Sequence, residues 1–384
     1  VPTFASKQLS QSAPMVSVAN TLTLVLETNV ELRANENSSL TFSGVTVNGM
    51  TAQTQIFATM SQQQGSDPLA TLGYQLFCTS PHATETRSTG VWDGATGDVV
   101  LTVCSGRTLM AHSTYQLEWT ITNPGSAQVS PAISIEAGGT AAFVKQDVIK
   151  PGTEVLGISN GADPLLVIVP VFKTKSIVQS TLHGGVQNLI TVTVMTNVDL
   201  TESGNNHILV CCLSNAVLNS TTVAVAVTGE ESGTVPEFCS DASGNPGHGT
   251  WDASLFSVKL YVCPGSQVSS FEQFSVSFNV TNPSVSQESP FVTISAAGSV
   301  TILESNMSKP AYAGELVHGV GGVTDVMRVV VPELTTKVVG QSSPFSGQLN
   351  TLTVTLQSAF DISDAYDSAV TIIGLEGAIV SGSK

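Results

Sequence analysis

Six cysteines are the residues of this 384-residue chain whose spacing points most directly to a covalent bond. Four of them flank two tryptophans in the same order along the chain: Cys78, Trp92 and Cys104, then Cys239, Trp251 and Cys263. The repeated arrangement predicts two disulfides, Cys78–Cys104 and Cys239–Cys263, each closing a loop of about 25 residues and worth on the order of 3 kcal/mol. Disulfides indicate an oxidising, extracellular compartment, and reduced buried thiols are the alternative.

The remaining two cysteines, Cys211 and Cys212, are adjacent. Adjacent cysteines can form a strained vicinal disulfide, bond to another chain, or remain as two buried free thiols in a strand. The sequence leaves these alternatives open. A metal site at the cysteines is not predicted, because no histidine or further cysteine stands at ligand spacing.

Acidic side chains gather in one loop near the C-terminus, at Asp361, Asp364 and Asp367. Carboxylate oxygens are preferred ligands of Ca²⁺, so this loop is a candidate calcium site, although its spacing does not match an EF-hand. A solvated acidic loop is the alternative interpretation.

Catalytic patterns are missing from the sequence. The 6 histidines are scattered, and no zinc-protease, nucleophile-elbow or phosphate-loop motif is present. Asp93 and Asp252 each follow a tryptophan and are expected to cap turns. The sequence therefore predicts neither an enzyme nor a bound cofactor.

Candidate glycosylation sites occur at four Asn-x-Ser/Thr sequons: Asn37, Asn219, Asn279 and Asn306. Asn279 lies between Phe278 and Val280. The alternation predicts that these two apolar side chains point inward and that Asn279 faces solvent. Covalently attached glycans are predicted partners if the source is eukaryotic.

The charge of the chain excludes some partners. It carries 13 Lys and Arg against 29 Asp and Glu, a net charge of −16. Such a balance disfavours nucleic acid and anionic membrane surfaces, since both require clustered basic residues. No apolar stretch reaches the length of a membrane span. The chain starts at Val1 without a targeting segment, which we interpret as processing; a trimmed chain is the alternative.

The elements that carry these residues are repeated. A Val-Pro pair followed five residues later by lysine marks the start of three units: Val1-Pro2 with Lys7, Val169-Pro170 with Lys175, and Val331-Pro332 with Lys337. The segment from Trp92 to Pro131 also recurs without gaps from Trp251 to Pro290. Fixed-period similarity of this kind is typical of tandem-domain proteins.

Strands are the predicted elements of each unit. Apolar residues alternate at equivalent positions: Leu22, Leu24 and Leu26; Ile190, Val192 and Val194; Leu352, Val354 and Leu356. This period of two is the pattern of half-buried strands. The apolar runs at 163–172 and 325–334 predict further long strands, interrupted by Pro170 and Pro332.

The units resemble tandem immunoglobulin-like β-sandwiches of cell-surface and filament proteins. The resemblance covers the whole chain, is architectural, and implies an all-β chain of tandem antiparallel sandwiches with a truncated third repeat. Cys78, Trp92 and Cys104 follow the immunoglobulin order, but the cysteines stand too close for the usual inter-sheet bridge. We expect an N-terminal Val-Pro strand at 1–15 with an inter-subunit role, sandwiches at 16–168 and 169–330, and a partial repeat at 331–384 that a neighbouring subunit completes.

The partial units at both ends predict a function. Open apolar edges pair with other chains, and head-to-tail contacts that do not close produce helical filaments. We therefore expect a homopolymer, an extracellular pilus-like fibre whose subunits share strands at these residues: Val1, Pro2, Phe4, Val331, Pro332 and Leu334.

Two alternatives remain open from the sequence. The chain can be a fragment of a longer tandem-repeat surface protein, and it can be an adhesin or carbohydrate-binding protein. A cluster of exposed aromatic residues would favour the adhesin, and the sequence pattern shows none, since most Trp and Tyr stand at strand positions.

Overall fold

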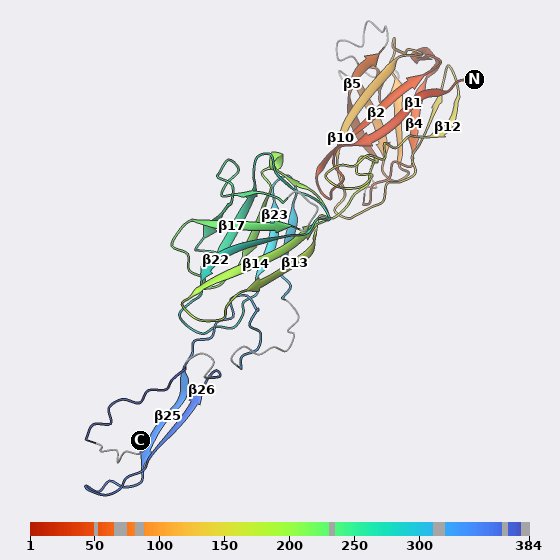
Figure 1. The fold of residues 1–384 in the computed structure, drawn as a ribbon. Helices are drawn as coiled ribbons and strands as arrows, with labels where there is room; N and C mark the ends of the chain where they lie inside the picture. The colour runs from red at the N-terminus through yellow and green to blue at the C-terminus, as the bar shows by residue number, and fades with distance from the viewer. Residues whose placement is uncertain are drawn as a thin grey trace.

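The computed structural model describes residues 1–49, 53–64, 75–80, 88–229, 235–309, 319–362 and 368–377. They form two β-sandwiches and a C-terminal β-hairpin, which lie in a line (Figure 1). The predicted all-β class of tandem sandwiches is confirmed. Within the described residues the helical elements are two 3-10 turns, η1 (Ala34–Glu36) and η3 (Glu202–Gly204).

The sequence repeat is a repeat of strands. The first sandwich contains β1 (Phe4–Gln11), β2 (Ala19–Thr28), β3 (Leu32–Arg33), β4 (Ser39–Ser43), β5 (Gln53–Gln64), β6 (Phe77–Cys78), β7 (Ser88–Asp93), β8 (Asp98–Val103), β9 (Thr108–Leu109), β10 (Thr114–Thr122), β11 (Ser134–Gly138) and β12 (Phe143–Asp147). The second contains β13 (Phe172–Gln179), β14 (Gln187–Thr196), β15 (Leu200–Thr201), β16 (His207–Cys211), β17 (Thr222–Gly229), β18 (Phe238–Cys239), β19 (His248–Asp252), β20 (Ser257–Val262), β21 (Gln267–Val268), β22 (Phe274–Thr281), β23 (Thr293–Ala297) and β24 (Ile302–Asn306). The hairpin consists of β25 (Leu334–Gln341) and β26 (Leu352–Ser358).

Strand order is the same in both sandwiches. Neighbouring strands run β1-β2-β10-β5-β7-β8-β4-β11-β12 in the first and β13-β14-β22-β17-β19-β20-β16-β23-β24 in the second. The strand pairs are antiparallel, as predicted. Each hairpin β1–β2, β13–β14 and β25–β26 also carries a register shift at the same place, near its first residue.

Alternation of apolar and polar residues decides which face of each strand is buried. The buried positions of β2 and β14 correspond: Leu22, Leu24 and Leu26 in the first sandwich, Ile190, Val192 and Val194 in the second. Each such side chain contributes about 1.5–3 kcal/mol of hydrophobic stabilisation. On β26 the equivalent Leu352 and Leu356 are 39% and 40% exposed. The pattern that builds a core twice therefore leaves an open apolar face in the third unit.

One strand of each sandwich belongs to both sheets. β5 pairs with β7 through Gln53–Ala58 and with β10 through the residues from Thr59 onward. β17 makes the same crossing between β19 and β22. On the opposite side, Gln8 of β1 forms a parallel bridge with Ile149, beyond β12. The two sheets are thus joined on both sides, which leaves few open edges.

Three buried amide side chains hold residues 152–168, which close the first sandwich and are called its closing segment below. Asn20 Nδ2 donates to Gln11 Oε1 and to Asn123 Oδ1, at 2.9 Å each. Gln11 Nε2 donates onward to the backbone carbonyls of Gly161 and Leu166, at 2.9 and 2.8 Å. Because all three amides are buried, each polar group left unpaired would cost about 1–3 kcal/mol.

The second sandwich repeats this amide network with Gln179, Asn188 and Asn282. Gln179 Nε2 donates to the carbonyls of Val323 and Arg328, which lie in the closing segment of the second sandwich, residues 319–330. In the third unit Asn350 Nδ2 donates to Gln341 Oε1 at 3.0 Å, but this pair is exposed. The hairpin therefore carries the beginning of a network whose other members occur only in complete sandwiches.

The closing segments are not the long strands that the sequence predicts at 163–172 and 325–334. They consist of turns and single bridges, and β13 and β25 begin only at Phe172 and Leu334. Leu165 and Met327 adopt left-handed backbones with φ of 60° and 56°. The strand prediction is wrong there because buried side chains, such as Gln11, bind the carbonyls that a ladder would use.

The amide network predicts a large difference between two equivalent asparagines. Asn188→Ala leaves Gln179 Oε1 and Asn282 Oδ1 buried without a donor, so the second sandwich should lose about 3 kcal/mol of unfolding free energy. Asn350→Ala, the matched control, should change it by less than about 0.5 kcal/mol. Differential scanning calorimetry of the full chain measures both. Equal effects of the two substitutions would contradict a role for the network.

Candidate functional site

Both predicted disulfides are present. Cys78–Cys104 and Cys239–Cys263 each have Cα atoms 5.2 Å apart. Each bond joins a two-residue strand to the residue that follows its pairing partner, β6 to β8 and β18 to β20. They lie within one sheet, which is the physical reason that their spacing is shorter than that of the immunoglobulin inter-sheet bridge.

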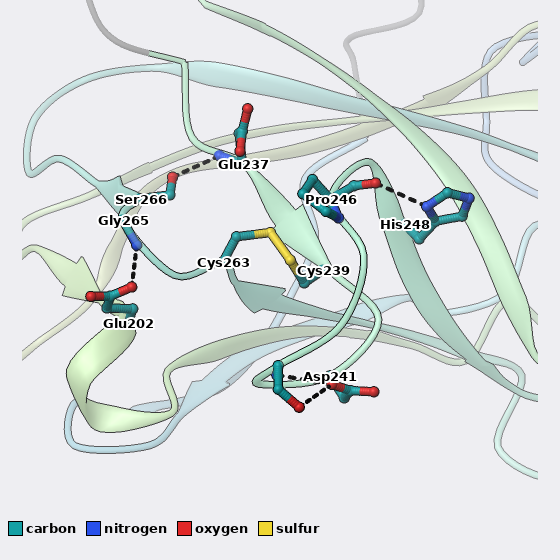
Figure 2. The surroundings of a disulfide bond; sticks show 10 residues. Glu202, Glu237, Cys239, Asp241, Pro246, His248, Cys263, Gly265 and Ser266 are labelled. Carbon is teal, nitrogen blue, oxygen red and sulfur yellow. Dashed lines mark hydrogen bonds between the residues drawn. A yellow bond between two sulfur atoms is a disulfide. The ribbon is translucent and has the colours of Figure 1, made fainter.

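Figure 2 shows the surroundings of the second disulfide, between Cys239 and Cys263. Beside it the backbone N–H of Glu237 donates to Ser266 Oγ at 2.8 Å, and the N–H of Gly265 donates to the carboxylate of Glu202. His248 Nδ1 lies 3.0 Å from the carbonyl oxygen of Pro246. These contacts hold turns, so this neighbourhood has a structural role.

Cys211 and Cys212 are free thiols at the end of β16, with their sulfurs 2.7 Å apart. Burial, then the hydrogen bond with Cys212, raises the pKa of Cys211 to about 12. Cys212 adopts a left-handed backbone with φ 75°, where the other two units have Gly44 and Gly374. In this structure the two thiols are unbonded and half-buried, and Cys212 lies just beyond the strand, so the vicinal disulfide is absent. A bond to another chain stays an alternative.

The aspartates that follow the tryptophans cap turns, as expected. Asp93 Oδ1 accepts from the N–H of Ala95 at 2.9 Å, and Asp252 Oδ1 accepts from the N–H and hydroxyl of Ser254. The hydrogen bonds from Ser254 lower the pKa of Asp252.

The candidate calcium loop is only partly described. Asp364 and Asp367 lie outside the described residues, and Asp361 lies next to Gly319. Among the residues that the structure describes, no group of three His, Cys, Asp or Glu side chains is close enough to hold a metal ion.

The four sequon asparagines are all exposed: Asn37, Asn219, Asn279 and Asn306. Asn279 lies on β22 between the buried Phe278 and Val280, so its predicted orientation is confirmed. Whether any of the four carries a glycan stays a prediction.

The residues expected at the assembly site form two groups, one at the N-terminus and one where the second sandwich passes into the hairpin. At the N-terminus Val1 is fully exposed and Pro2 is half-buried, whereas Phe4 packs against Phe143 with ring centroids 4.9 Å apart. β1 pairs with β2 inside the first sandwich. At the passage into the hairpin Val331 and Leu334 are half-buried, and Pro332 is exposed; the N–H of Val331 donates to Ser286 Oγ of the second sandwich at 2.9 Å.

The junction between the two sandwiches is formed by specific hydrogen bonds and buried side chains, which the sequence does not predict. The carbonyl of Leu156, in the closing segment of the first sandwich, accepts from the N–H of Asp199 at 2.9 Å. Gly157 O accepts from Ser270 Oγ at 2.9 Å, and Asp199 Oδ1 accepts from the N–H of Ser270 at 2.7 Å. The buried Ile158 belongs to the core of the second sandwich.

Apolar contacts widen this junction. Met15 of the first unit is buried in the core of the second sandwich, and further side chains of the first unit pack against that core: Val18, Leu156, Leu166 and Ile168. A tight turn brings the backbones together, because Gly157 has φ 71° and a Cβ there would collide with Ser270 and Asp199. The same closing segment thus binds the sandwich before it and the sandwich after it.

A similar contact begins between the closing segment of the second sandwich and the loop after β26. Gly319, with φ 76°, lies beside Asp361, and a Cβ on it would stand 2.9 Å from Asp361 Oδ1. Asp361 corresponds to Asp199 in the repeat, and Gly319 corresponds to Gly157. Asp361 therefore lies at the position of the junction residue Asp199. The sequence shows only that its loop is acidic, and the contact with Gly319 depends on the fold.

Comparisons with known proteins show no family. No family model matches the chain, and no curated protein does. Among solved structures it is similar to the C-terminal domain of the Streptococcus agalactiae antigen I/II polypeptide BspA, with 9% identity over 79% of this chain and 98% of that chain, at a TM-score of 0.38. The C-terminal domain of the Streptococcus pyogenes antigen I/II-family protein AspA gives 8% identity, 79% and 98% coverage and a TM-score of 0.35. The collagen adhesin of S. aureus gives 10%, 80% and 90%, at 0.21.

Similarity at this level assigns no function to the chain. Within the described residues no helix has the length and apolar character required to cross a membrane.

The raised pKa of Cys211 predicts slow alkylation that accelerates with pH. Only the thiolate reacts, so below a pKa of about 12 the rate at Cys211 should rise about tenfold per pH unit from pH 7 to pH 10. Iodoacetamide labelling followed by peptide mass spectrometry measures the rate, and Cys211→Ser isolates the contribution of Cys212. A rate that levels off near pH 9, or no labelling without a reductant, would contradict two free thiols with this pKa.

Proposed function

We propose that this chain is a structural segment of an extracellular surface protein, in which docked β-sandwiches form a rigid rod. The junction at Gly157 carries this proposal, because one closing segment is bound by two sandwiches at once through hydrogen bonds and buried apolar side chains. The recurrence of its first half at Gly319 and Asp361 supports a regular array. Two disulfides support an oxidising location outside the cell.

A rod of this kind serves to hold a binding or anchoring part at a distance from a surface. Flexible linkers would leave the domains free to reorient, which is the default for small interdomain contacts. Here the linker itself is folded, since its residues 152–168 are bound by Gln11, Gln128 and Ser130 of the first sandwich. Charged residues make up 11% of the chain, and this low content suits an exposed fibre more than a carrier of charged ligands.

A filament of this chain is the second candidate function, favoured by the unpaired edge of β26 and the exposed apolar residues Leu352 and Leu356. In the complete copies the edge equivalent to that of β26, on β2 or β14, is paired with β10 or β22, strands that are directly followed by a buried asparagine. A strand of that pattern from another subunit would complete the unit by β-strand addition. A following half-repeat of a longer polypeptide would do the same without polymerisation.

The rod predicts that one glycine controls the angle between the sandwiches. Gly157→Val should displace Asp199 and Ser270 and loosen the junction while both sandwiches stay folded. Gly152→Val is the matched control, because its φ is 65° but its nearest neighbour, Asn160 Oδ1, is 3.7 Å from the added Cβ. Small-angle X-ray scattering should show a broadened distance distribution for the first variant only. Identical scattering curves for the parent chain and both variants would contradict the rigid rod.

The filament predicts association through the hairpin. Sedimentation velocity of the 384-residue chain should show concentration-dependent polymers, and Leu352→Asp with Leu356→Asp should abolish them without changing the melting of the sandwiches. Deleting residues 1–15 is a poorer test, because Leu9 and Gln11 belong to the first core. A parent chain that stays monomeric would exclude the filament.

A further inference from the structure

The two cysteines that the fold leaves unbonded, Cys211 and Cys212, are placed for reaction with each other. Adjacent side chains of a strand normally point to opposite faces of a sheet. β16 ends at Cys211, and Cys212 has a left-handed φ of 75°, so the chain turns here and the two sulfur atoms lie 2.7 Å apart. A movement of about 0.7 Å would bring them to the disulfide bond length of about 2.05 Å.

The repeat shows that the fold itself does not require a side chain at Cys212. The first sandwich has Ser43-Gly44 at these positions, and the third unit has Ile373-Gly374. A Cβ on Gly44, whose φ is 86°, would stand 2.2 Å from the carbonyl oxygen of Ala132. Left-handed backbone disfavours every residue with a Cβ relative to glycine. The second sandwich therefore carries a thiol at a position where the fold favours glycine, which indicates a role for the sulfur.

Exposure separates this pair from the two structural disulfides. The four cysteines of the structural disulfides are at most 5% exposed, whereas Cys211 and Cys212 are both half-buried. Small oxidants and reductants can therefore reach the pair while the buried disulfides are shielded. A disulfide between adjacent residues is also strained, and strained or exposed disulfides are the ones that thiols reduce readily.

We propose that Cys211 and Cys212 are a reversible oxidation site. A low-molecular-weight disulfide, such as oxidised glutathione, converts the two thiols into a vicinal disulfide, and small thiols open it again. Without such an oxidant the pair stays as two thiols, the form present in this structure. The site is independent of the rod and of the filament, because it needs only the second sandwich.

The oxidation takes place in two thiol–disulfide exchange steps. Cys212, as the thiolate, attacks one sulfur of oxidised glutathione and releases the first glutathione. Cys211 then loses its proton, attacks the Cys212 sulfur and releases the second glutathione, so two protons and two electrons pass from the cysteines to the two glutathione molecules.

The order of the two steps follows from the surroundings of Cys211. Burial, then the hydrogen bond with Cys212, raises the pKa of Cys211 to about 12, so Cys211 is the second thiol to react. The short distance between the sulfurs compensates for its small thiolate fraction, because the second attack is intramolecular.

The turn that follows the pair is bound to the closing segment of the second sandwich through Gln287. Gln287 Nε2 donates to the carbonyl of Ser214 at 3.0 Å and to that of Met327 at 2.7 Å. Gln287 Oε1 accepts from Asn215 Nδ2 at 2.9 Å. The ring of a vicinal disulfide restricts the backbone at the start of this turn. Oxidation should therefore stiffen the turn that supports the closing segment.

Alkylation and mass spectrometry of the full chain test the oxidation site. The dithiol form is incubated with mixtures of oxidised and reduced glutathione, free thiols are blocked with iodoacetamide, and the peptides are analysed. We expect the peptide with both cysteines to lose two hydrogen atoms, to carry no glutathione, and to regain both thiols when a small thiol is added. Both structural disulfides should stay closed throughout.

Two variants copy the first sandwich into the second, so both should fold. Cys211→Ser should stop at a glutathione adduct on Cys212, because the second attack is lost. Cys212→Gly should leave a thiol that reacts at least about tenfold more slowly than the parent pair. Glutathione retained on the parent chain, disulfide-linked dimers, or two thiols that stay free in excess oxidised glutathione would overturn the site.

Hydrogen exchange tests the effect on the turn. The N–H of Leu213 donates to the carbonyl of Phe256 at 3.0 Å, and its equivalent in the first sandwich, Val45, donates to that of Gly97 at 2.8 Å. Oxidation should slow exchange at Leu213 several-fold and leave Val45 unchanged. The double variant with Cys211→Ser and Cys212→Gly should not respond to oxidised glutathione. Unchanged exchange at Leu213 in the oxidised parent would overturn the stiffening of the turn.

Discussion

The buried amide network is the constraint on which the other features depend. A glutamine at the end of the first strand and two asparagines from neighbouring strands satisfy one another, and the glutamine then binds two carbonyls of the closing segment. These groups would be costly to bury unpaired, so the closing segment has one permitted position. Apolar packing alone would hold it less specifically, because many placements bury similar area.

Fixing the closing segment has a consequence for the next domain. The turn at Leu156–Ile158 projects from the first sandwich with its carbonyls and apolar side chains already oriented, and the second sandwich binds it through Asp199 and Ser270. The interdomain contact therefore requires little ordering of a flexible linker, a cost that normally weakens such contacts. The same geometry recurs at the end of the second sandwich, where Gly319 lies against Asp361 as Gly157 lies against Asp199.

Much of this fold could be predicted from the sequence, because the alternation of Leu22, Leu24 and Leu26 and its two copies define the strands and their buried faces. The disulfides and the exposure of Asn279 follow from the same repeat. The crossing of β5 between two sheets could not be predicted, since both sheets demand the same alternating pattern along one strand. The sequence predicts a strand for the closing segment because apolar content does not distinguish a strand ladder from backbone whose carbonyls are bound by Gln11.

Residual dipolar couplings of the two sandwiches in the 384-residue chain test the central claim most directly. If the amide-anchored closing segment docks both domains, one alignment tensor should fit the couplings from β1–β12 and from β13–β24 with the relative orientation of Figure 1. Two tensors of different magnitude would mean that the sandwiches move independently, and would contradict the rigid rod.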